Sequence, residues 1–464
     1  MSANIDVFNK SRVRVGKWMK PLVQQGPTRC FALGAGRPLY SQLQTSRAAP
    51  FAIRTLVTDN GKQPTDTEQY SAVVVGAGAS GIAVTGSLLD TLGHGSRIAW
   101  VDPDFKGGRI NACYREVPSN TIAQTFLDYG KGFESFRRAA QAVSEPNGLT
   151  KLAALEPKST CSLHHAGDML QTLSDGLLRD SQVSGLKGAV VKASRGKSPS
   201  GWVMTIQGKE SQSTPAQRLV APLVVYCTGS HPATVKLPTP AAETPKTLGL
   251  DDVLKPSVLK NTLPKDRPIC VGVIGASHSA ILVLRNLLDL SRDSHPQLRV
   301  RWFTRHKELK YAKYMDGWIL YDNTGLKGLA AEFGRQYLEG DQLAKSGAGE
   351  IITRVDCSGG AEQEKAAFLR ELPQCDHIVQ AVGFSKNELP DMETEIEFDN
   401  ITGGFVDRAT GQPVPGLFGA GIAFPERVTD KAGNVEYAVG FFKFMKFLKR
   451  VVPSWVGVNQ KSTR

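Results

Sequence analysis

A run of three valines at residues 73–75 is followed by a glycine-rich turn and then by helix-like spacing of apolar residues. Uninterrupted apolar runs of this kind are typical of a parallel strand that is buried on both faces. A second apolar run at residues 97–101 predicts the next strand. The pattern therefore predicts strand, tight turn, helix and strand, in that order.

The turn carries glycines at Gly76, Gly78 and Gly81, and in this setting the spacing G-x-G-x-x-G is typical of a dinucleotide-binding loop. The three glycines allow a tight turn, close approach of a pyrophosphate and close packing of helix on strand. The start of the following helix offers free N–H groups to phosphate, and Ala79 and Ser80 are expected among the residues that bind the cofactor. A glycine-rich loop without a ligand is the alternative interpretation.

An acidic residue, Asp102, ends the second predicted strand, 21 residues after Gly81. A carboxylate at this distance is expected to bind a ribose 2′-hydroxyl, which favours FAD or NAD over NADP. A Gly-Gly-Arg sequence follows and ends at Arg109. Its guanidinium could bind a phosphate of the cofactor or lie in solvent.

The same order of elements recurs later, with a strand predicted at 269–274 and a helix at 281–290. In the turn between them Ser277 replaces the second glycine and Ala280 the third. The following strand, 298–303, leads to basic residues and to no acid, which favours a ribose 2′-phosphate and so NADPH over NADH. A solvated basic loop is the alternative. The residues expected at this second site are Gly275, Ser277, His278, Ser279 and Arg305.

Two more predicted strands end in glycine turns, one over 223–227 and one over 416–421. The carboxyl ends of parallel strands meet at one edge of the sheet, where ligands bind in such folds. We therefore expect Thr228, Gly229, Gly421 and Ile422 at a cofactor.

The remaining pattern predicts a polar linker over 59–70, helices over 121–143, 164–179 and 433–450, and a β-meander over 187–225. The aromatic segment 311–338 could line a substrate cleft or belong to the core.

Charge is uneven along the chain. Residues 1–58 hold nine Lys or Arg and one acid, so most of the net charge of +12 lies there. Such a segment, with apolar residues interleaved at 13–23, suits a mitochondrial transit peptide or a disordered basic extension of a cytoplasmic protein equally well. The rest is nearly balanced, which does not indicate nucleic-acid binding.

The sequence lacks the patterns that are typical of a dithiol redox pair, of a metal site and of a transmembrane helix. The seven cysteines form no C-x-x-C pair, no spacing typical of a metal site is present, and no apolar run reaches the roughly 18 residues of a transmembrane helix.

Taken together, the two glycine motifs with their closing turns resemble the two-dinucleotide-binding-domain flavoproteins. The resemblance is greatest to the flavin monooxygenase and lysine/ornithine N-hydroxylase branch, because the C-x-x-C of the disulfide reductases is missing. It implies an α/β fold of two Rossmann-like domains, with the NADP domain inserted into the FAD domain. The expected divisions are a basic N-terminal extension (1–69), the first part of the FAD domain (70–262), the NADP domain (263–370) and the C-terminal part of the FAD domain (371–464).

The resemblance implies an FAD-dependent, NADPH-using monooxygenase that hydroxylates a small molecule with O2 through a flavin C4a-(hydro)peroxide. The alternative is an NAD(P)H-dependent flavoprotein reductase that passes electrons to a quinone or a protein. Because the flavin supplies the chemistry, no catalytic acid or base is predicted. The residues considered for such a role are His278, beside the expected NADP site, and Lys313 or Asp316, in the aromatic segment. The sequence leaves the oligomeric state and the substrate open.

Overall fold

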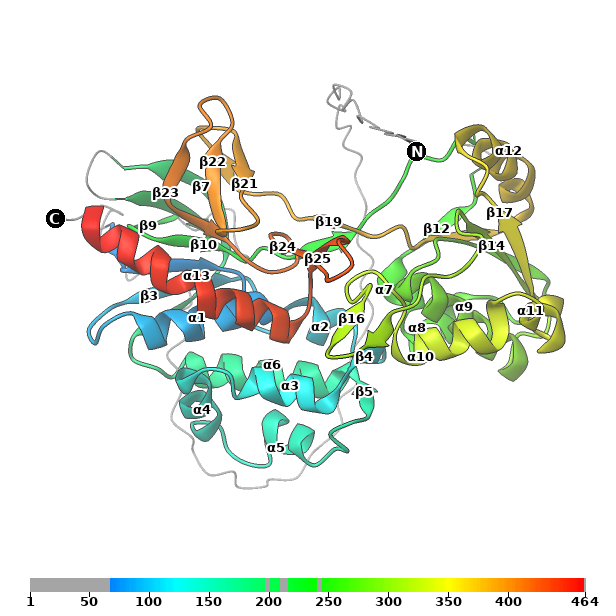
Figure 1. Ribbon diagram of the computed structural model, residues 1–464, viewed down its shortest axis with the longest axis horizontal. Coiled ribbons are helices and arrows are strands. Elements are labelled where there is room, and N and C mark those ends of the chain that lie inside the picture. The colour runs from blue at the N-terminus through cyan, green and yellow to red at the C-terminus, as the bar shows by residue number, and fades with distance from the viewer. Residues whose placement is uncertain (1–66, 197–200, 209–215, 240–243, 463–464) are drawn as a thin grey trace, which may run out of the picture. The chain divides into compact units, whose positions relative to one another are not determined.

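The computed structural model describes residues 67–196, 201–208, 216–239 and 244–462 (Figure 1). The expected N-terminal extension lies outside the described residues up to position 66, including the apolar stretch at 13–23. The polar linker predicted over 59–70 is wrong at its C-terminal end, where the structure has a short strand. There, β1 (Glu68–Gln69) pairs with β9 (Gln217–Ala221), because a neighbouring sheet edge accepts these polar residues.

The predicted first strand lies inside a seven-stranded sheet with the order β21-β22-β23-β10-β2-β3-β6. From β23 to β6 the neighbouring strands run parallel. Every residue of β2 is buried, which explains its unbroken apolar sequence. The strands are β2 (Ala72–Val75), β3 (Ile98–Asp102), β6 (Val183–Lys187), β10 (Val224–Tyr226), β21 (Ile396–Phe398), β22 (Gly404–Asp407) and β23 (Pro413–Gly419).

Helices cover one face of this sheet and a second sheet covers the other. Figure 1 shows α1 (Ala79–Thr91) and α13 (Phe441–Ser462) side by side over the sheet, and α6 (Leu163–Leu177) packs against α1. Val74 faces this helical core, whereas Val73 and Val75 face the second sheet, as the alternation of a strand requires.

The second sheet is the predicted β-meander, with the order β1-β9-β8-β7-β20. The sequence predicted its three central strands, and β1 and β20 add an edge on either side. The other strands of this sheet are β7 (Ala189–Arg195), β8 (Trp202–Gln207) and β20 (Asp391–Met392).

A separate parallel sheet, β12-β18-β13-β14-β17, holds the second glycine motif. Its strands are β12 (Lys246–Leu248), β13 (Ile269–Ile274), β14 (Leu298–Thr304), β17 (Ile352–Asp356) and β18 (His377–Gln380). The helix after the motif, α9 (His278–Asp293), supplies much of the apolar core on this sheet.

The two parallel sheets repeat one arrangement around their glycine strands. β2 lies between β3 and β10, and β13 lies between β14 and β18. In each, a buried tryptophan on the following strand donates its indole N–H to the first glycine's carbonyl. Trp100 bonds to Gly76 at 2.9 Å and Trp302 to Gly275 at 2.8 Å. Because β23 rejoins the first sheet after the second is complete, the predicted α/β class with two Rossmann-like units is confirmed.

The remaining elements are short. None of the helices in the described ranges is long and apolar enough to cross a membrane. The helices are α2 (Gly108–Cys113), α3 (Ala123–Gly130), α4 (Glu134–Gln141), α5 (Gly148–Ala153), α7 (Leu250–Val253), α8 (Pro256–Thr262), α10 (Gly328–Phe333), α11 (Gln342–Lys345) and α12 (Ala361–Glu371). The strands are β4 (Pro118–Ile122), β5 (Thr160–Ser162), β11 (Ser230–Pro232), β15 (Lys313–Met315), β16 (Trp318–Leu320), β19 (Phe384–Lys386), β24 (Glu426–Thr429) and β25 (Val435–Ala438).

The single helix predicted over 121–143 is wrong, since the segment forms the end of β4 followed by α3 and α4. α4 starts anew because the Asp90 carboxylate, on α1, accepts hydrogen bonds from the backbone N–H groups of Glu134 and Ser135 at 2.8 and 2.9 Å. This cap comes from another helix and leaves no local trace in the sequence.

The helix predicted over 433–450 begins too early. Residues 426–438 form the hairpin β24–β25, in which the Asp430 carboxylate accepts the N–H groups of Ala432 and Asn434. Helix α13 begins only at Phe441, after Gly440 with a φ of +143°. Lys443 and Lys446 therefore lie near the start of α13.

Candidate active site

The first glycine-rich loop joins β2 to α1 and has the backbone that its spacing predicts. Gly76 has a φ of +108°, and a Cβ there would lie 2.3 Å from the carbonyl oxygen of Cys227. A Cβ on Gly81 would lie 1.9 Å from the carbonyl oxygen of Gly76, so the helix packs on the turn only with glycine. A Cβ on Gly78 would meet nothing nearer than the Gly108 Cα at 3.8 Å. The loop is therefore open at its second glycine.

The carboxylate of Asp102 holds this loop in shape. Its Oδ2 accepts the N–H of Ala77 at 2.7 Å, and its Oδ1 accepts those of Asp104 and Phe105 at 2.8 and 2.7 Å. These bonds tie the end of β3 to the glycine loop. Oδ2 accepts one hydrogen bond and keeps a further acceptor position, whereas Oδ1 already accepts two. The ribose contact expected from the sequence stays a prediction.

The second glycine-rich loop repeats the geometry of the first. Gly275 has a φ of +132°, and a Cβ there would lie 2.3 Å from the carbonyl oxygen of Ala381 on the neighbouring strand. Ser277 is the exposed residue before α9. His278 and Ser279 begin that helix and line the cavity described below.

His278 is held as a neutral hydrogen-bond acceptor. Its Nε2 accepts the backbone N–H of Lys327 at 3.0 Å. Burial, together with the positive charge of Lys327, lowers the pKa of His278 to about 4. The imidazole is therefore uncharged near neutral pH, and its proton lies on Nδ1.

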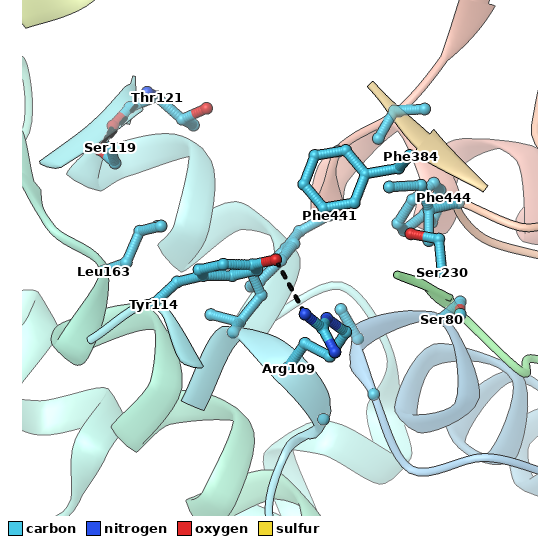
Figure 2. A pocket seen from close by; sticks show the side chains of 18 of the residues that line it. Ser80, Arg109, Tyr114, Ser119, Thr121, Leu163, Ser230, Phe384, Phe441 and Phe444 are labelled. Carbon is cyan, nitrogen blue, oxygen red and sulfur yellow. Dashed lines mark hydrogen bonds between the residues drawn. The ribbon is translucent and has the colours of Figure 1, made fainter. Parts of the chain in front are cut away.

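A cavity of about 580 Å³ extends between the two loops. It is lined by the starts of α1, α9 and α13 and by the turns after β3 and β10. Figure 2 shows Ser80 and Ser230 towards one end of the lining, and Ser119 and Thr121 towards the other. Aromatic side chains, Phe384 among them, make up much of the wall. The predicted residues that line it are Gly76, Gly78, Ala79, Ser80, Asp102, Arg109, Thr228, Gly229, His278, Ser279 and Ile422.

The turn after β10 presents an unused polar group at this cavity. The Oγ1 of Thr228 is buried and has no hydrogen-bond partner within the described ranges. Asn387 fixes the turn, because it donates from Nδ2 to the Thr228 carbonyl at 2.7 Å and from its backbone N to the Gly229 carbonyl at 3.0 Å. A buried hydroxyl without a partner is unfavourable unless a ligand or water completes it.

The turn predicted at Gly421 and Ile422 lies against the first glycine-rich loop. Gly421 has a φ of +93°, and a Cβ there would lie 2.3 Å from the Oγ of Ser80. Ile422 follows it on the cavity wall. The start of α13, from Gly440 to Phe444, lies on the same wall. The end of the chain thus completes a site begun near its first strand.

Arg109 lies on the cavity as expected, but its guanidinium has partners in the protein. It forms an ion pair with Asp251, on α7, and donates to the Tyr114 hydroxyl at 3.4 Å (Figure 2). Tyr114 in turn donates to Asp251 at 2.9 Å, and burial raises the pKa of this tyrosine. The sequence analysis missed Tyr114 and Asp251.

A second charged group, which was not predicted from the sequence either, also lines the cavity. The carboxylate of Asp322 contacts the ammonium groups of Lys327 at 2.8 Å and Lys443 at 2.7 Å. Burial alone would raise the pKa of Asp322, but the hydrogen bonds from the two lysines lower it overall. Burial lowers the pKa of Lys443, which also donates to Asn323 at 2.6 Å.

Seven of the site residues named from the sequence are absent from the cavity lining, and Gly81, Gly275, Ser277 and Gly421 are four of them. Lys313 and Asp316, named as catalytic candidates, lie in the exposed hairpin β15–β16 and are not part of the lining. Arg305 is also absent from the lining and bonds to Glu364 at 2.7 Å. By strand register Thr304, and no acid, takes the place that Asp102 has in the first unit.

The first half of the site fits a flavin dinucleotide. The N–H groups at the start of α1 are free of intrahelical partners, as at any helix start. Gly78 leaves room for a pyrophosphate, and Thr228 holds an unused hydroxyl. The described residues gather no three His, Cys, Asp or Glu side chains that could hold a metal ion.

No protein-family model matches the chain. It is 50% identical over 394 residues to Monooxygenase AgnR1 of Paecilomyces divaricatus, a match that covers 84% of this chain and 98% of that protein. The structure is similar to the reduced form of ornithine hydroxylase (PvdA) from Pseudomonas aeruginosa, with a TM-score of 0.54 and 11% identity over 85% of this chain and all of that one. A bacillithiol disulfide reductase from Staphylococcus aureus gives a TM-score of 0.47 and 11% identity, covering 86% of this chain and 98% of its own.

The ornithine hydroxylase supports the fold, and the relative at 50% identity identifies the family. The chain belongs to the family of monooxygenases that includes Monooxygenase AgnR1 of Paecilomyces divaricatus.

Proposed function

We propose that this protein is an FAD-dependent monooxygenase that uses NADPH and O2 to hydroxylate a small molecule. One observation carries the proposal: the first glycine-rich loop and the first residues of both α1 and α9, the helices that follow the two loops, line one cavity. A hydride can pass between two bound cofactors only if both reach the same space.

The first unit supplies the residues for FAD. The N–H groups at Ala79 and Ser80 would bind its pyrophosphate, and the Thr228 hydroxyl would donate to or accept from the cofactor. When bound, the flavin supplies the redox chemistry, because it accepts a hydride from NADPH and activates O2 as a C4a-(hydro)peroxide.

The second unit supplies the residues for NADPH. Its phosphates would bind at the start of α9, where Ser277 and Ser279 add hydroxyl groups to the free N–H groups. Arg305 lies one residue past β14 and would bind the 2′-phosphate once it leaves Glu364. His278, the first residue of α9, stays neutral, so it adds no positive charge of its own at this phosphate site.

The aromatic wall serves the substrate and the oxygen chemistry. Phe384, Phe441 and Phe442 line the cavity from β19 and from the start of α13. Apolar rings in these positions exclude water from the reacting atoms, which protects a reactive oxygen species from hydrolysis. They also favour a substrate with an apolar part.

Rapid mixing of the intact protein tests the proposal. The yellow protein is reduced with NADPH under argon, O2 is then admitted, and spectra are recorded on the millisecond scale. The proposal expects a transient absorbance of oxygenated reduced flavin before the oxidised spectrum returns. Direct return without a transient favours the alternative, a reductase that passes electrons to a quinone or a protein. A protein that binds no FAD contradicts both.

A matched pair of variants tests the FAD contact without measuring turnover. Thr228→Val removes the unused hydroxyl at the cavity, and we expect weaker retention of FAD during dialysis. Thr85→Val removes another buried hydroxyl without a partner within the described ranges, but this one lies inside α1 and away from the cavity lining. Equal loss of FAD from both variants would contradict the assignment of Thr228.

A further inference from the structure

Two cysteines far apart in the sequence face each other in the second unit. Cys270 lies at the start of β13, and Cys375 comes just before β18. Their Sγ atoms are 3.8 Å apart. The backbone at this point is held firmly, since the Asp376 N–H donates to the Cys270 carbonyl and the Cys270 N–H donates to the Asp376 carboxylate, both at 2.8 Å.

The two Sγ atoms need only a short movement to reach the separation of a disulfide bond. A disulfide needs an S–S separation of about 2.05 Å, so each sulfur would move by roughly 1 Å. The β13 side leaves room for this movement, because a Cβ on Gly272 would lie 3.3 Å from the Cys375 Sγ and that Cβ is absent.

The two thiols differ in access and in charge. Cys270 is partly exposed and Cys375 is buried. The hydrogen bond with Cys375 and the positive charge of Arg301 lower the pKa of Cys270, although burial opposes them. The hydrogen bond with Cys270 and burial raise the pKa of Cys375. Cys270 therefore has the accessible, thiolate-prone sulfur, and Cys375 is placed as its resolving partner.

We propose that Cys270 and Cys375 form a reversible disulfide when the protein meets hydrogen peroxide. The Cys270 sulfur attacks one peroxide oxygen, the O–O bond breaks, and the second oxygen leaves as water with the thiol proton. The Cys375 sulfur then attacks the Cys270 sulfenic acid, the S–O bond breaks, and a second water leaves with the Cys375 proton. Two thiols are oxidised by two electrons, and one peroxide is reduced to two waters.

The disulfide would stabilise the second unit, and it would lie at the opposite end of β13 from the expected cofactor site. Cys270 and Gly275 lie at opposite ends of β13, roughly 16 Å apart at the rise of a strand. The bond would join β13 to the chain leading into β18, closing a long loop. We therefore expect a higher melting temperature and an unchanged ability of NADPH to reduce the flavin.

Mass spectrometry of the full-length protein with FAD tests the proposal. A small molar excess of hydrogen peroxide is expected to remove two hydrogen masses per chain, and dithiothreitol should restore them. Proteolysis without reductant should release a cross-linked peptide pair containing Cys270 and Cys375. In Cys375→Ser, the sulfenic acid should remain on Cys270 and react with dimedone. Cys161→Ser is the control, since Cys161 is also partly exposed and its side-chain hydrogen bond is to Ser119 and not to a thiol.

Three outcomes would overturn the proposal. The first is that wild-type protein loses no hydrogen mass at a peroxide dose that oxidises Cys161. The second is a cross-link that joins other cysteines. The third is a dimedone adduct on Cys270 in the wild-type protein with no cross-link to Cys375. The wild-type measurements decide the matter even if a variant fails to fold.

Discussion

Replacing Trp302 by Phe removes the hydrogen bond that holds the first glycine of the second loop, and replacing Trp100 by Phe removes its counterpart in the first loop. Both indoles are almost completely buried, with exposed fractions of 1% and 0%. Each donates Nε1–H to the carbonyl of a glycine with positive φ. The two substitutions therefore perturb one equivalent contact in each unit.

The expected cost follows from burial and from volume. A buried carbonyl that loses its donor costs about 1–3 kcal/mol. Shrinking a buried indole to a phenyl ring leaves a small cavity, which adds about 1 kcal/mol. If the whole cost of the unpaired carbonyl destabilised the loop conformation that binds the cofactor, affinity for the cofactor would fall by between about fivefold and 150-fold.

Cofactor titration separates the two loops. Trp302→Phe should raise the NADPH concentration needed for half-maximal flavin reduction under argon, and leave the bound FAD per chain unchanged. Trp100→Phe should lower the affinity for FAD. Trp202→Phe is the matched control, because this indole is also buried and donates to the Pro415 carbonyl at 3.0 Å, from β8 of the meander sheet to β23 of the first sheet. It should lower the free energy of unfolding and change neither cofactor. The reasoning fails if the control shifts a cofactor affinity as much as the loop variants do.

Three shorter predictions concern single positions. Gly421→Ala should reduce bound FAD per chain by flavin absorbance, because it combines positive φ with a clash, whereas Gly411→Ala, at a φ of +69° with nothing within 4 Å, should not. The folded state holds His278 neutral down to about pH 4 while the unfolded chain protonates near its usual 6.5, so stability falls with acidity in that window, and His278→Gln should flatten the melting temperature against pH there. Glu364→Gln frees Arg305 and should lower the KM for NADPH but not for NADH; an equal change for both coenzymes would remove Arg305 from the 2′-phosphate site.

The two glycine loops could be predicted from the sequence because their geometry depends on residues next to one another. The φ values at Gly76 and Gly275 and the close contact at Gly81 follow from a strand that turns directly into a helix. The buried parallel strands were predictable for the same reason, since each is a short apolar run bounded by turns.

Other elements depend on contacts that the sequence does not display. α4 is a separate helix because Asp90 of α1 caps it. The hairpin β24–β25 is stabilised at its base by Glu436, whose carboxylate accepts the Asn323 N–H at 3.0 Å from a distant segment. Burial would raise the pKa of Glu436, but the hydrogen bonds from Thr324 and Asn323 lower it overall. A local pattern cannot reveal a cap or an anchor supplied from elsewhere in the chain.

The same distinction divides the predicted site. Contacts made by the backbone need only the local turn, and the loops at Gly76 and Gly275 have that turn before any ligand arrives. Contacts made by charged side chains need an uncommitted charge, and Asp102, Arg109 and Arg305 each already bond within the protein. Phosphate binding at the helix starts can therefore proceed on a preformed surface, whereas recognition of the ribose groups requires these side chains to share or exchange partners. The exchange is least costly for Arg305, since this side chain is 70% exposed and ion pairs in water contribute little. Discrimination between NADPH and NADH is thus the property of this site that a single surface substitution can change most readily.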